Sequence, residues 1–495
     1  MLTSLLIVIS LLTLSFPLIK HILKEQKKQK VKQQILASYL IEIQEEIDNL
    51  PFDTYLQKTW LYEEVIDEVL EIYHQDKKVL KLLDIEETPD IIMIIKDREL
   101  WLRDINQLFI EQELESYKAY LDHIESNPLT DMQCLAVLTN EENNLILAGA
   151  GSGKTSVIVA KVGYVLNKGY VEAHEVLVLA FNKKAQQELA ERISEKLALD
   201  IEVKTFHALG KKIVDSSYNQ NCSDFSKMIS QAIEAINKGD YTSPYKYIFI
   251  DEFQDISIER NSLILALKNQ QHPCNITVVG DDWQGINSFA GSELSIIQNF
   301  ESFYGHTATI KLDYTFRFNA TLAKVSQEFI LKNAQQIHKE IKTIEPENPN
   351  TLYLYAYDNK NKMDEYIEAI VAFIAKRVEE QKSIMILSRY GFYKPKNLES
   401  LSAKYKQLSF SFETIHGSKG LEADYIILTH LESGKFGFPS EQKAVELDDY
   451  PYAEERRLFY VALTRAKEKV FMIGNSKEPS VFIEEILREH EVILF

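Results

Sequence analysis

A glycine-rich loop near residue 150 constrains the fold of this chain more than any other feature. A short apolar strand is expected at residues 145–148, followed by the segment GAGSGKT at residues 149–155 and a helix from Ser156. In such a loop the small residues let backbone N–H groups surround phosphates at the N-terminus of a helix. The pattern predicts an α/β domain that binds a nucleotide. The expected contacts are Ala148, Gly149, Ala150, Gly151, Ser152, Gly153, Lys154 and Thr155.

Two side chains of this loop have individual roles in the prediction. Lys154 is expected to neutralise the β- and γ-phosphates of ATP, and the Thr155 hydroxyl is expected to coordinate Mg²⁺. Ala148 stands where the strict pattern has its first glycine. The predicted cofactors are therefore ATP and Mg²⁺.

Short apolar runs separated by helical segments continue from this loop to the end of the chain. Such runs indicate parallel sheets that are covered by helices on both faces. A single core rarely grows beyond about 250 to 300 residues, so a chain of 495 residues is expected to divide. We predict two sheets, from runs at residues 145–148, 176–181, 247–250, 276–279, 352–355, 384–387, 425–428 and 470–473.

Two adjacent carboxylates follow the run at residues 247–250. Because ligands of α/β sheets bind at the carboxyl ends of strands, Asp251 and Glu252 are expected beside the phosphate-binding loop. Asp251 would then bind magnesium, either directly or through one of the ligands of the ion. Glu252 would orient or deprotonate the attacking water. The alternative is an acidic N-cap of a helix, but that does not account for the position of the pair after a buried strand.

A third polar cluster, at residues 280–292, follows the run at residues 276–279. Gln284 in this cluster is the expected reader of the γ-phosphate. Arg317 and Arg465 lie in the second half of the chain and would act as arginine fingers if the two halves close over ATP. Taken alone, an arginine in each of these positions would more often form a surface ion pair.

The first 19 residues contain an uncharged run, residues 2–19, that is long enough to cross a bilayer as a helix. Lysines dominate the next segment, which predicts that everything after Lys20 lies in the cytoplasm. We therefore predict a single-pass anchor in the inner, or cytoplasmic, membrane. A signal peptide is the alternative, but a basic n-region and a small-residue cleavage site are missing. A hydrophobic helix that docks on a partner is the other alternative.

Charge is distributed unevenly along the chain. The formal net charge is −19, and residues 41–125 alone carry −15. This helical, acidic segment is an unfavourable surface for a DNA backbone and is a candidate surface for a protein partner. The residues after 125 carry −9, so any nucleic acid is expected in a local groove. Three cysteines without CxxC spacing support neither a disulfide framework nor a zinc site.

The motifs, in their order along the chain, resemble those of the UvrD/Rep-type superfamily 1 DNA helicases, most closely the helicase IV branch. The resemblance covers residues 127 to about 483. NPLTDMQ at residues 127–133 resembles the Q motif, DEFQD at 251–255 resembles Walker B, and DDWQ at 281–284 is especially like helicase IV. Residues 414–424 and 454–467 resemble motifs V and VI. The resemblance implies two RecA-like domains.

The resemblance also implies roles for individual residues. Gln133 would read adenine, Phe316 would stack on it, Glu422 would lie near the ribose, and Arg465 would be the arginine finger. The segments LAFNKK at residues 179–184 and TFHALG at 205–210 resemble those that hold single-stranded DNA. The implied DNA contacts are Phe181, Asn182, Thr205, Phe206, His207, Phe289 and His416.

Three features depart from the family pattern. Asn287 stands where the family often has a base-stacking aromatic, which leaves Phe289 as the expected platform. The spacings of 96 residues from Thr155 to Asp251 and 97 from Arg317 to Thr414 leave no room for large accessory subdomains. A membrane anchor is the third departure, because the family pattern does not include one.

Together these patterns predict an ATP-driven helicase or translocase on single-stranded or tailed DNA, for which the resemblance implies 3′ to 5′ polarity. Some relatives of this branch act on RNA polymerase, so the alternative is a nucleotide-gated switch or a transcription-associated translocase that works through a protein partner. The predicted domains are an anchor at residues 1–19, an acidic helical domain at 20–126, and RecA-like domains at 127–300 and 301–490.

Overall fold

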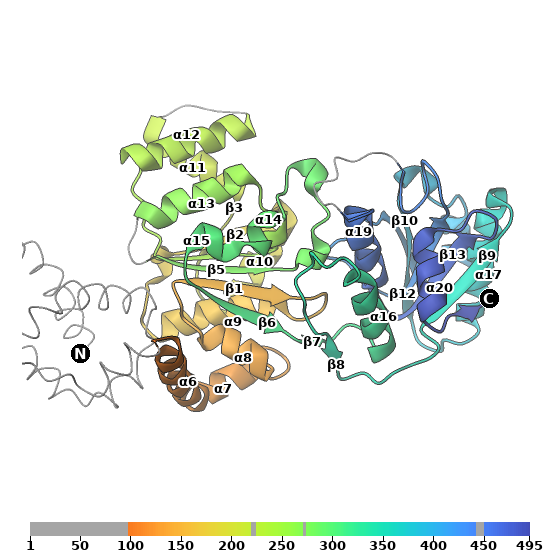
Figure 1. The fold of residues 1–495 in the computed structure, drawn as a ribbon, viewed down its shortest axis with the longest axis horizontal. Coiled ribbons are helices and arrows are strands. Elements are labelled where there is room, and N and C mark those ends of the chain that lie inside the picture. The colour runs from red at the N-terminus through yellow and green to blue at the C-terminus, as the bar shows by residue number, and fades with distance from the viewer. Residues whose placement is uncertain (1–97, 219–223, 271–273, 442–449) are drawn as a thin grey trace, which may run out of the picture. The chain divides into compact units, whose positions relative to one another are not determined.

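The computed structural model describes residues 98–218, 224–270, 274–441 and 450–495 (Figure 1). The predicted anchor at residues 2–19 and residues 20–97 of the predicted acidic domain lie outside this range. The described part of that domain forms two helices, α6 (Arg98–Ser116) and α7 (Lys118–His123). None of the helices within the described residues is both long and apolar enough to span a membrane.

The first sheet has six parallel strands in the order β3-β2-β4-β5-β1-β6. Its central strands are buried along their whole length, as expected for a sheet covered on both faces. The strands are β1 (Asn143–Ala148), β2 (Val176–Ala180), β3 (Glu202–Thr205), β4 (Tyr247–Ile250), β5 (Asn275–Gly280) and β6 (Thr307–Leu312).

Helices cover both faces of this sheet (Figure 1). Three helices, α11 (Phe206–Tyr218), α12 (Phe225–Lys238) and α13 (Ile258–Gln270), contribute to one apolar core with the strands. On the other side lies α9 (Lys154–Asn167). The remaining elements are α8 (Asp131–Leu138), α10 (Lys183–Leu197), α14 (Ser295–Gln298) and α15 (Phe300–Tyr304).

The second sheet also has six parallel strands, in the order β11-β10-β12-β13-β9-β14. This confirms the predicted pair of parallel sheets. The first sheet extends through β6 to Leu312, past residue 300 where the sequence placed the domain boundary. The strands are β9 (Leu352–Tyr357), β10 (Lys382–Ser388), β11 (Leu408–Thr414), β12 (Ala423–Leu431), β13 (Ala466–Asn475) and β14 (Ile493–Leu494).

Alternate residues of the second sheet enter two different cores. Leu354 and Ile426 pack with α16 (Ala320–Ile330), α19 (Ala453–Leu463) and α20 (Val481–Glu489). Their neighbours Tyr353 and Ile427 pack with α17 (Met363–Ala375) and α18 (Leu398–Lys404). This is the period of two that a strand imposes. A small parallel pair, β7 (Tyr314–Thr315) and β8 (Lys342–Thr343), lies between the two sheets in the sequence.

Candidate active site

The glycine-rich loop joins β1 directly to α9, as the sequence predicts. Gly151 and Gly153 adopt φ angles of 73° and 81°, a left-handed region that glycine enters without strain. A Cβ atom at Gly153 would lie 2.6 Å from the Gln133 amide nitrogen, and one at Gly151 would lie 2.6 Å from Cβ of Arg317. Both glycines therefore serve a tight turn and a close approach of neighbouring chain.

Lys154 is folded back over this loop. Its ammonium group donates to the carbonyl oxygens of Ala148 at 2.9 Å and Gly149 at 3.0 Å. Burial lowers the pKa of Lys154, while Glu252 and Asp281 oppose that shift. An ammonium group that is held by two carbonyl oxygens can exchange them for the oxygens of a phosphate.

The two carboxylates at the end of β4 occupy different electrostatic environments. Burial, followed by the charge of Glu252, raises the pKa of Asp251 to about 7. Burial also opposes ionisation of Glu252, but Lys419 and Lys154 hold its pKa below the ordinary value. Two adjacent carboxyl groups, one buried and one partly buried, favour a cation between or near them. Thr155 and Asp251 both line the cavity described below and fit a magnesium site of oxygen ligands.

Glu252 has an unusual backbone conformation. Its φ angle is 49°, a region that non-glycine residues adopt only at a cost. The Asp251 carboxylate accepts a hydrogen bond from the Glu252 amide at 2.9 Å, and the Gln254 amide donates to the Glu252 carboxylate. These contacts hold the Glu252 carboxylate at the cavity that it lines.

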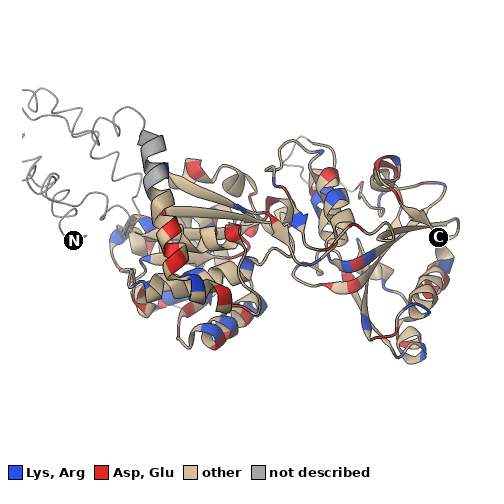
Figure 2. Ribbon diagram, turned by 90° about the horizontal axis from the view of Figure 1, so that it is seen from below, with Lys and Arg blue, Asp and Glu red and all other residues tan. Residues whose placement is uncertain are grey.

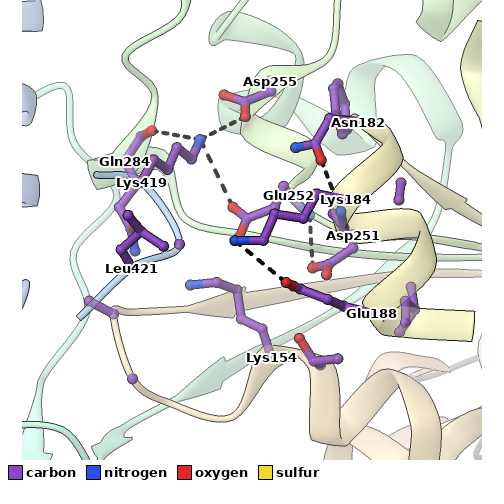
Figure 3. Close-up of a pocket in the computed structure, with 18 of the residues that line it drawn as sticks. Lys154, Asn182, Lys184, Glu188, Asp251, Glu252, Asp255, Gln284, Lys419 and Leu421 are labelled. Carbon is purple, nitrogen blue, oxygen red and sulfur yellow. Dashed lines mark hydrogen bonds and ion pairs between the residues drawn. The ribbon is translucent and has the colours of Figure 1, made fainter. Parts of the chain in front are cut away.

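Loops from both sheets enclose one cavity of about 810 Å³. Lys154, Asp251, Glu252 and Lys419 meet there (Figure 3). The cavity brings together most of the predicted catalytic and nucleotide-binding side chains. From the first sheet come Ala150, Gly151, Ser152, Gly153, Lys154, Thr155, Asp251, Glu252 and Gln284; Arg317 and Arg465 complete the set.

Gln284 connects the two sheets at this cavity. Its amide nitrogen donates to Asp281 at 2.6 Å, and its amide oxygen accepts from Arg465 at 3.3 Å. Arg465 is buried and also donates to the carbonyl oxygen of Val461 at 2.9 Å. Burial, followed by the charge of Arg317, lowers the pKa of Arg465 to about 9. Two guanidinium groups that line the same cavity favour an anion between them.

Arg317 is positioned by an ion pair with Glu422, at 2.9 Å, and by the carbonyl oxygen of Thr464, at 3.1 Å. Glu422 also pairs with Lys467 at 2.8 Å. Some predicted nucleotide contacts lie outside the cavity lining. Gln133 is buried and hydrogen-bonds the Ser152 carbonyl oxygen, and Phe316 is half-exposed. Ala148, Gly149 and Glu422 also lie outside the cavity lining.

Sequence reasoning missed Lys419, which joins the second sheet to the carboxylates of the first. Its ammonium group lies 2.7 Å from Asp255, 4.0 Å from Glu252 and 3.2 Å from the carbonyl oxygen of Gln284 (Figure 3). Lys419 lies within residues 414–424, the segment that resembles motif V, but the sequence assigns no role to this side chain. Only the approach of the two sheets places it here.

A second missed residue is Lys339, in the segment between α16 and β8. Its ammonium group is buried and lies 2.6 Å from Asp281 and 2.5 Å from Asp282. Burial opposes the charge of Lys339, but the two aspartates hold its pKa above the ordinary value. Since Asp281 also accepts from Gln284, Lys339 ties this connecting segment to the cavity.

The DNA contacts predicted in the first sheet fall into two groups. Phe181 and Asn182 line the cavity, and Asn182 caps α10 by accepting from the Ala185 amide. Phe206 is only 2% exposed and packs against Phe181 at 5.2 Å, so its ring is not available to a base in this structure. Thr205 accepts from the Ala208 amide, and His207 stacks on Phe225 at 5.9 Å.

Phe289 and His416 form the other predicted contact with DNA. The Phe289 ring is 75% exposed and meets the His416 ring edge-on at 5.4 Å. The neighbouring Asn287 hydrogen-bonds Asp255, which occupies its side chain at the cavity. Basic and acidic residues are interspersed along the helices and strands of both sheets (Figure 2).

His416 is expected to make unfolding depend on pH. Burial, followed by the charge of Arg389, lowers its pKa to about 4 from an ordinary value of 6.5. The stability that comes from neutral His416 is complete above pH 6.5 and is lost as the pH falls toward 4. Between pH 7 and pH 5 the wild type should lose about 1 to 2 kcal/mol of unfolding free energy more than a His416→Asn variant. Urea titrations at the two pH values measure this difference, and equal losses in the two proteins would contradict it.

Comparison with known proteins agrees with this geometry. The UvrD/REP helicase N-terminal domain matches residues 129–222 and 215–305, and the UvrD-like helicase C-terminal domain matches residues 393–477. DNA helicase IV of Escherichia coli K12 is 30% identical over 80% of this chain and 76% of that protein. A probable DNA helicase of Mycoplasma pneumoniae is 24% identical over 73% of this chain and 87% of its own length. The ATP-dependent DNA helicase PcrA of Staphylococcus aureus Mu50 is 24% identical over 48% of this chain and 44% of its own. The chain belongs to the UvrD/REP helicase family and is an ATP-hydrolysing enzyme of the DNA helicase class.

Proposed function

We propose that this protein moves along single-stranded DNA in the 3′ to 5′ direction, driven by ATP hydrolysis, and displaces a paired strand as it moves. The observation that supports the proposal is the cavity at which loops of both sheets meet. A nucleotide in this cavity contacts residues of both sheets, so its binding and hydrolysis change the contacts between the two sheets. DNA that spans both sheets would be shifted by that change.

Each side chain at the cavity has a defined part in this proposal. Lys154 binds the phosphates, and Glu252, whose lowered pKa keeps it ionised near neutral pH, accepts the proton of the attacking water. Gln284 orients that water or the γ-phosphate, and Arg317 and Arg465 neutralise the negative charge that develops there. Magnesium, held by Thr155 and Asp251, would supply further neutralisation of the phosphates when bound.

Lys419 is the proposed link between hydrolysis and movement. Its ammonium group contacts Asp255 and faces Glu252, so the charge at the cavity acts directly on the loop that precedes β12. That loop also carries His416, which contacts Phe289. Loss of the γ-phosphate would therefore alter the contact between His416 and Phe289, the exposed ring that we assign to DNA.

Strand displacement from tailed duplexes tests the proposed direction. The full-length protein should release the paired strand from a duplex with a 3′ single-stranded tail and should leave a 5′-tailed duplex of the same sequence intact. ATP without magnesium serves as the negative control. Equal activity on the 5′ tail, or preference for it, would overturn the proposed polarity.

We also propose that residues 2–19 tether the protein to the cytoplasmic membrane by a single span, with both sheets in the cytoplasm. The support is the uncharged run followed by lysines. Alkaline carbonate extraction of membranes should leave the full-length chain in the pellet and release a chain that lacks residues 2–19. Release of both chains would reject the tether.

The acidic segment supports a second candidate, in which the enzyme acts through a protein partner, including one linked to transcription. Residues 41–125 carry a net charge of −15, which suits a basic protein surface. Under this candidate ATP hydrolysis would not respond to single-stranded DNA and would respond to the partner. DNA-stimulated ATPase activity therefore distinguishes the two candidates.

A further inference from the structure

A cluster of aromatic rings, two of them exposed, lies at the carboxyl ends of β10 and β12, and none of its members has so far been assigned to DNA. We call it the aromatic platform and define it as Tyr390, Phe392, Tyr393, Phe436 and His430. Phe392 is 66% exposed and Phe436 is 44% exposed. Phe392 belongs to the short turn η6 (Gly391–Tyr393), which follows β10, and Phe436 follows β12.

The rings of the platform are ordered by contacts with one another. Tyr390 and Phe392 are stacked, with centroids 5.2 Å apart and an interplanar angle of 12°. Phe436 meets Phe392 edge-on at 5.8 Å. Tyr393 is stacked on His430 with centroids 3.6 Å apart. An exposed pair of parallel rings presents a flat apolar face to solvent, the shape that a nucleic-acid base stacks on.

Hydrogen bonds fix this arrangement before any ligand arrives. The Tyr390 hydroxyl bonds the Ser440 hydroxyl at 2.7 Å, and the Tyr393 hydroxyl donates to the carbonyl oxygen of Phe436 at 3.2 Å. His430 has a φ angle of 59° within an irregular stretch of β12. A non-glycine residue keeps such a conformation only where its surroundings impose it. The platform is therefore a preorganised surface, so binding costs little ordering.

Cations accompany the rings. Arg389 lies 5.0 Å from the centre of the Tyr390 ring and Lys435 lies 5.4 Å from that of Phe436. Lys394 and Lys396 follow η6 directly and are exposed. Interleaved rings and cations match a polymer that alternates bases with phosphates. A surface that binds an apolar protein partner would instead contain exposed aliphatic side chains. This cluster of described residues contains none.

The platform is continuous with Phe289 through the start of α19. Glu455 pairs with Arg389 at 2.8 Å and accepts from the Ser440 amide at 3.0 Å. Its neighbour Glu454 accepts from the Ser288 amide at 3.1 Å, one residue before Phe289. Adjacent residues of one helix therefore hold both sets of exposed rings. The same helix leads to Arg465 at the cavity.

We propose that the aromatic platform stacks bases of the single-stranded DNA, so that the second sheet grips the strand through bases as well as phosphates. This inference rests on the proposed function and adds a second site at which the protein binds the strand. Two stacking sites, one at Phe289 and one on the platform, are joined by the helix that responds to the nucleotide. A change at the cavity would then move one set of rings relative to the other.

The test compares binding of a normal and an abasic strand. Fluorescence anisotropy would measure binding of the full-length protein to labelled oligothymidine, and to the same strand with abasic sites, at one fixed salt concentration. Replacing both Phe392 and Phe436 with alanine should weaken binding of oligothymidine by about tenfold or more. The variant should discriminate less between the two strands than the wild type does, because a missing ring and a missing base remove the same contact.

Two further variants control for folding and for general loss of surface. Phe303→Ala removes a comparably exposed ring on α15 and should leave binding unchanged. Phe392→Tyr with Phe436→Tyr retains both rings and should bind as the wild type does. If the wild type binds oligothymidine and the alanine variant binds it equally well, the platform proposal is overturned and the rings are free to serve a protein contact. If the wild type fails to bind oligothymidine at all, the proposed function fails with it.

Discussion

Replacing Arg465 with alanine is expected to lower kcat for ATP hydrolysis by about 10³-fold or more. Arg465 is buried, lines the cavity and lies beside Gln284, and burial, followed by the charge of Arg317, lowers its pKa. The negative charge of an anion in the cavity grows during hydrolysis. A buried guanidinium group stabilises that growing charge most strongly. Steady-state ATP hydrolysis at saturating DNA measures the effect.

Two variants make this result specific. Arg465→Lys retains a charge but loses the planar guanidinium group, and should recover only part of the rate. Arg488→Ala removes an exposed arginine of α20 and should hydrolyse ATP as the wild type does. Binding of a fluorescent ATP analogue shows that the cavity is intact. A kcat within tenfold of the wild type, in a variant that still binds the analogue, would mean that Arg465 is not the finger.

Replacing Lys339 with methionine is expected to lower the free energy of unfolding by about 3 to 5 kcal/mol. The change retains the length of the side chain but leaves Asp281 and Asp282 buried without their cation. Burial already raises the pKa of Asp282, whereas the charge of Lys339 offsets burial and holds the pKa of Asp281 down. Urea unfolding followed by tryptophan fluorescence is a suitable measurement, because the Trp283 ring lies 4.5 Å from the ammonium group.

The matched control is Lys342→Met, three residues further along the same segment. Lys342 pairs with Asp313 at the surface, where exposed ion pairs contribute little to stability. This variant should unfold at the same urea concentration as the wild type. Equal unfolding midpoints for Lys339→Met and Lys342→Met would show that the buried pair does not hold the connecting segment in place.

The sequence predicts the centre of each sheet but not its edges. Each apolar run used to predict a strand coincides with one of the eight interior strands, although the run at residues 176–181 extends one residue past β2. Within the two six-stranded sheets, the four strands that were missed, β3, β6, β11 and β14, are the four edge strands. Three of them mix polar with apolar residues or alternate between them, as in Thr-Ala-Thr-Ile-Lys-Leu of β6, because an edge is partly solvated. The fourth contains only two residues, too few to form a pattern.

The candidate site follows the same division. Lys154, Glu252 and Gln284 could be found because each follows a buried strand in a recognisable segment, and the geometry does bring them together. Lys339 and the aromatic platform could not be found in this way, and Lys419, although it lies in the segment that resembles motif V, was given no role. Their positions depend on contacts between segments that are far apart in the sequence, and neither a single lysine nor a single phenylalanine carries a local signal of such a contact.

The most direct test of the central claim is ATP hydrolysis by the full-length protein with and without single-stranded DNA. Coupling of the cavity to a strand predicts a low rate without DNA and a rate that rises and saturates as oligothymidine is added. Glu252→Gln should bind ATP normally but abolish the DNA-stimulated rate, because the amide cannot accept a proton from water. A wild-type rate that is unchanged by DNA at any concentration would contradict the account.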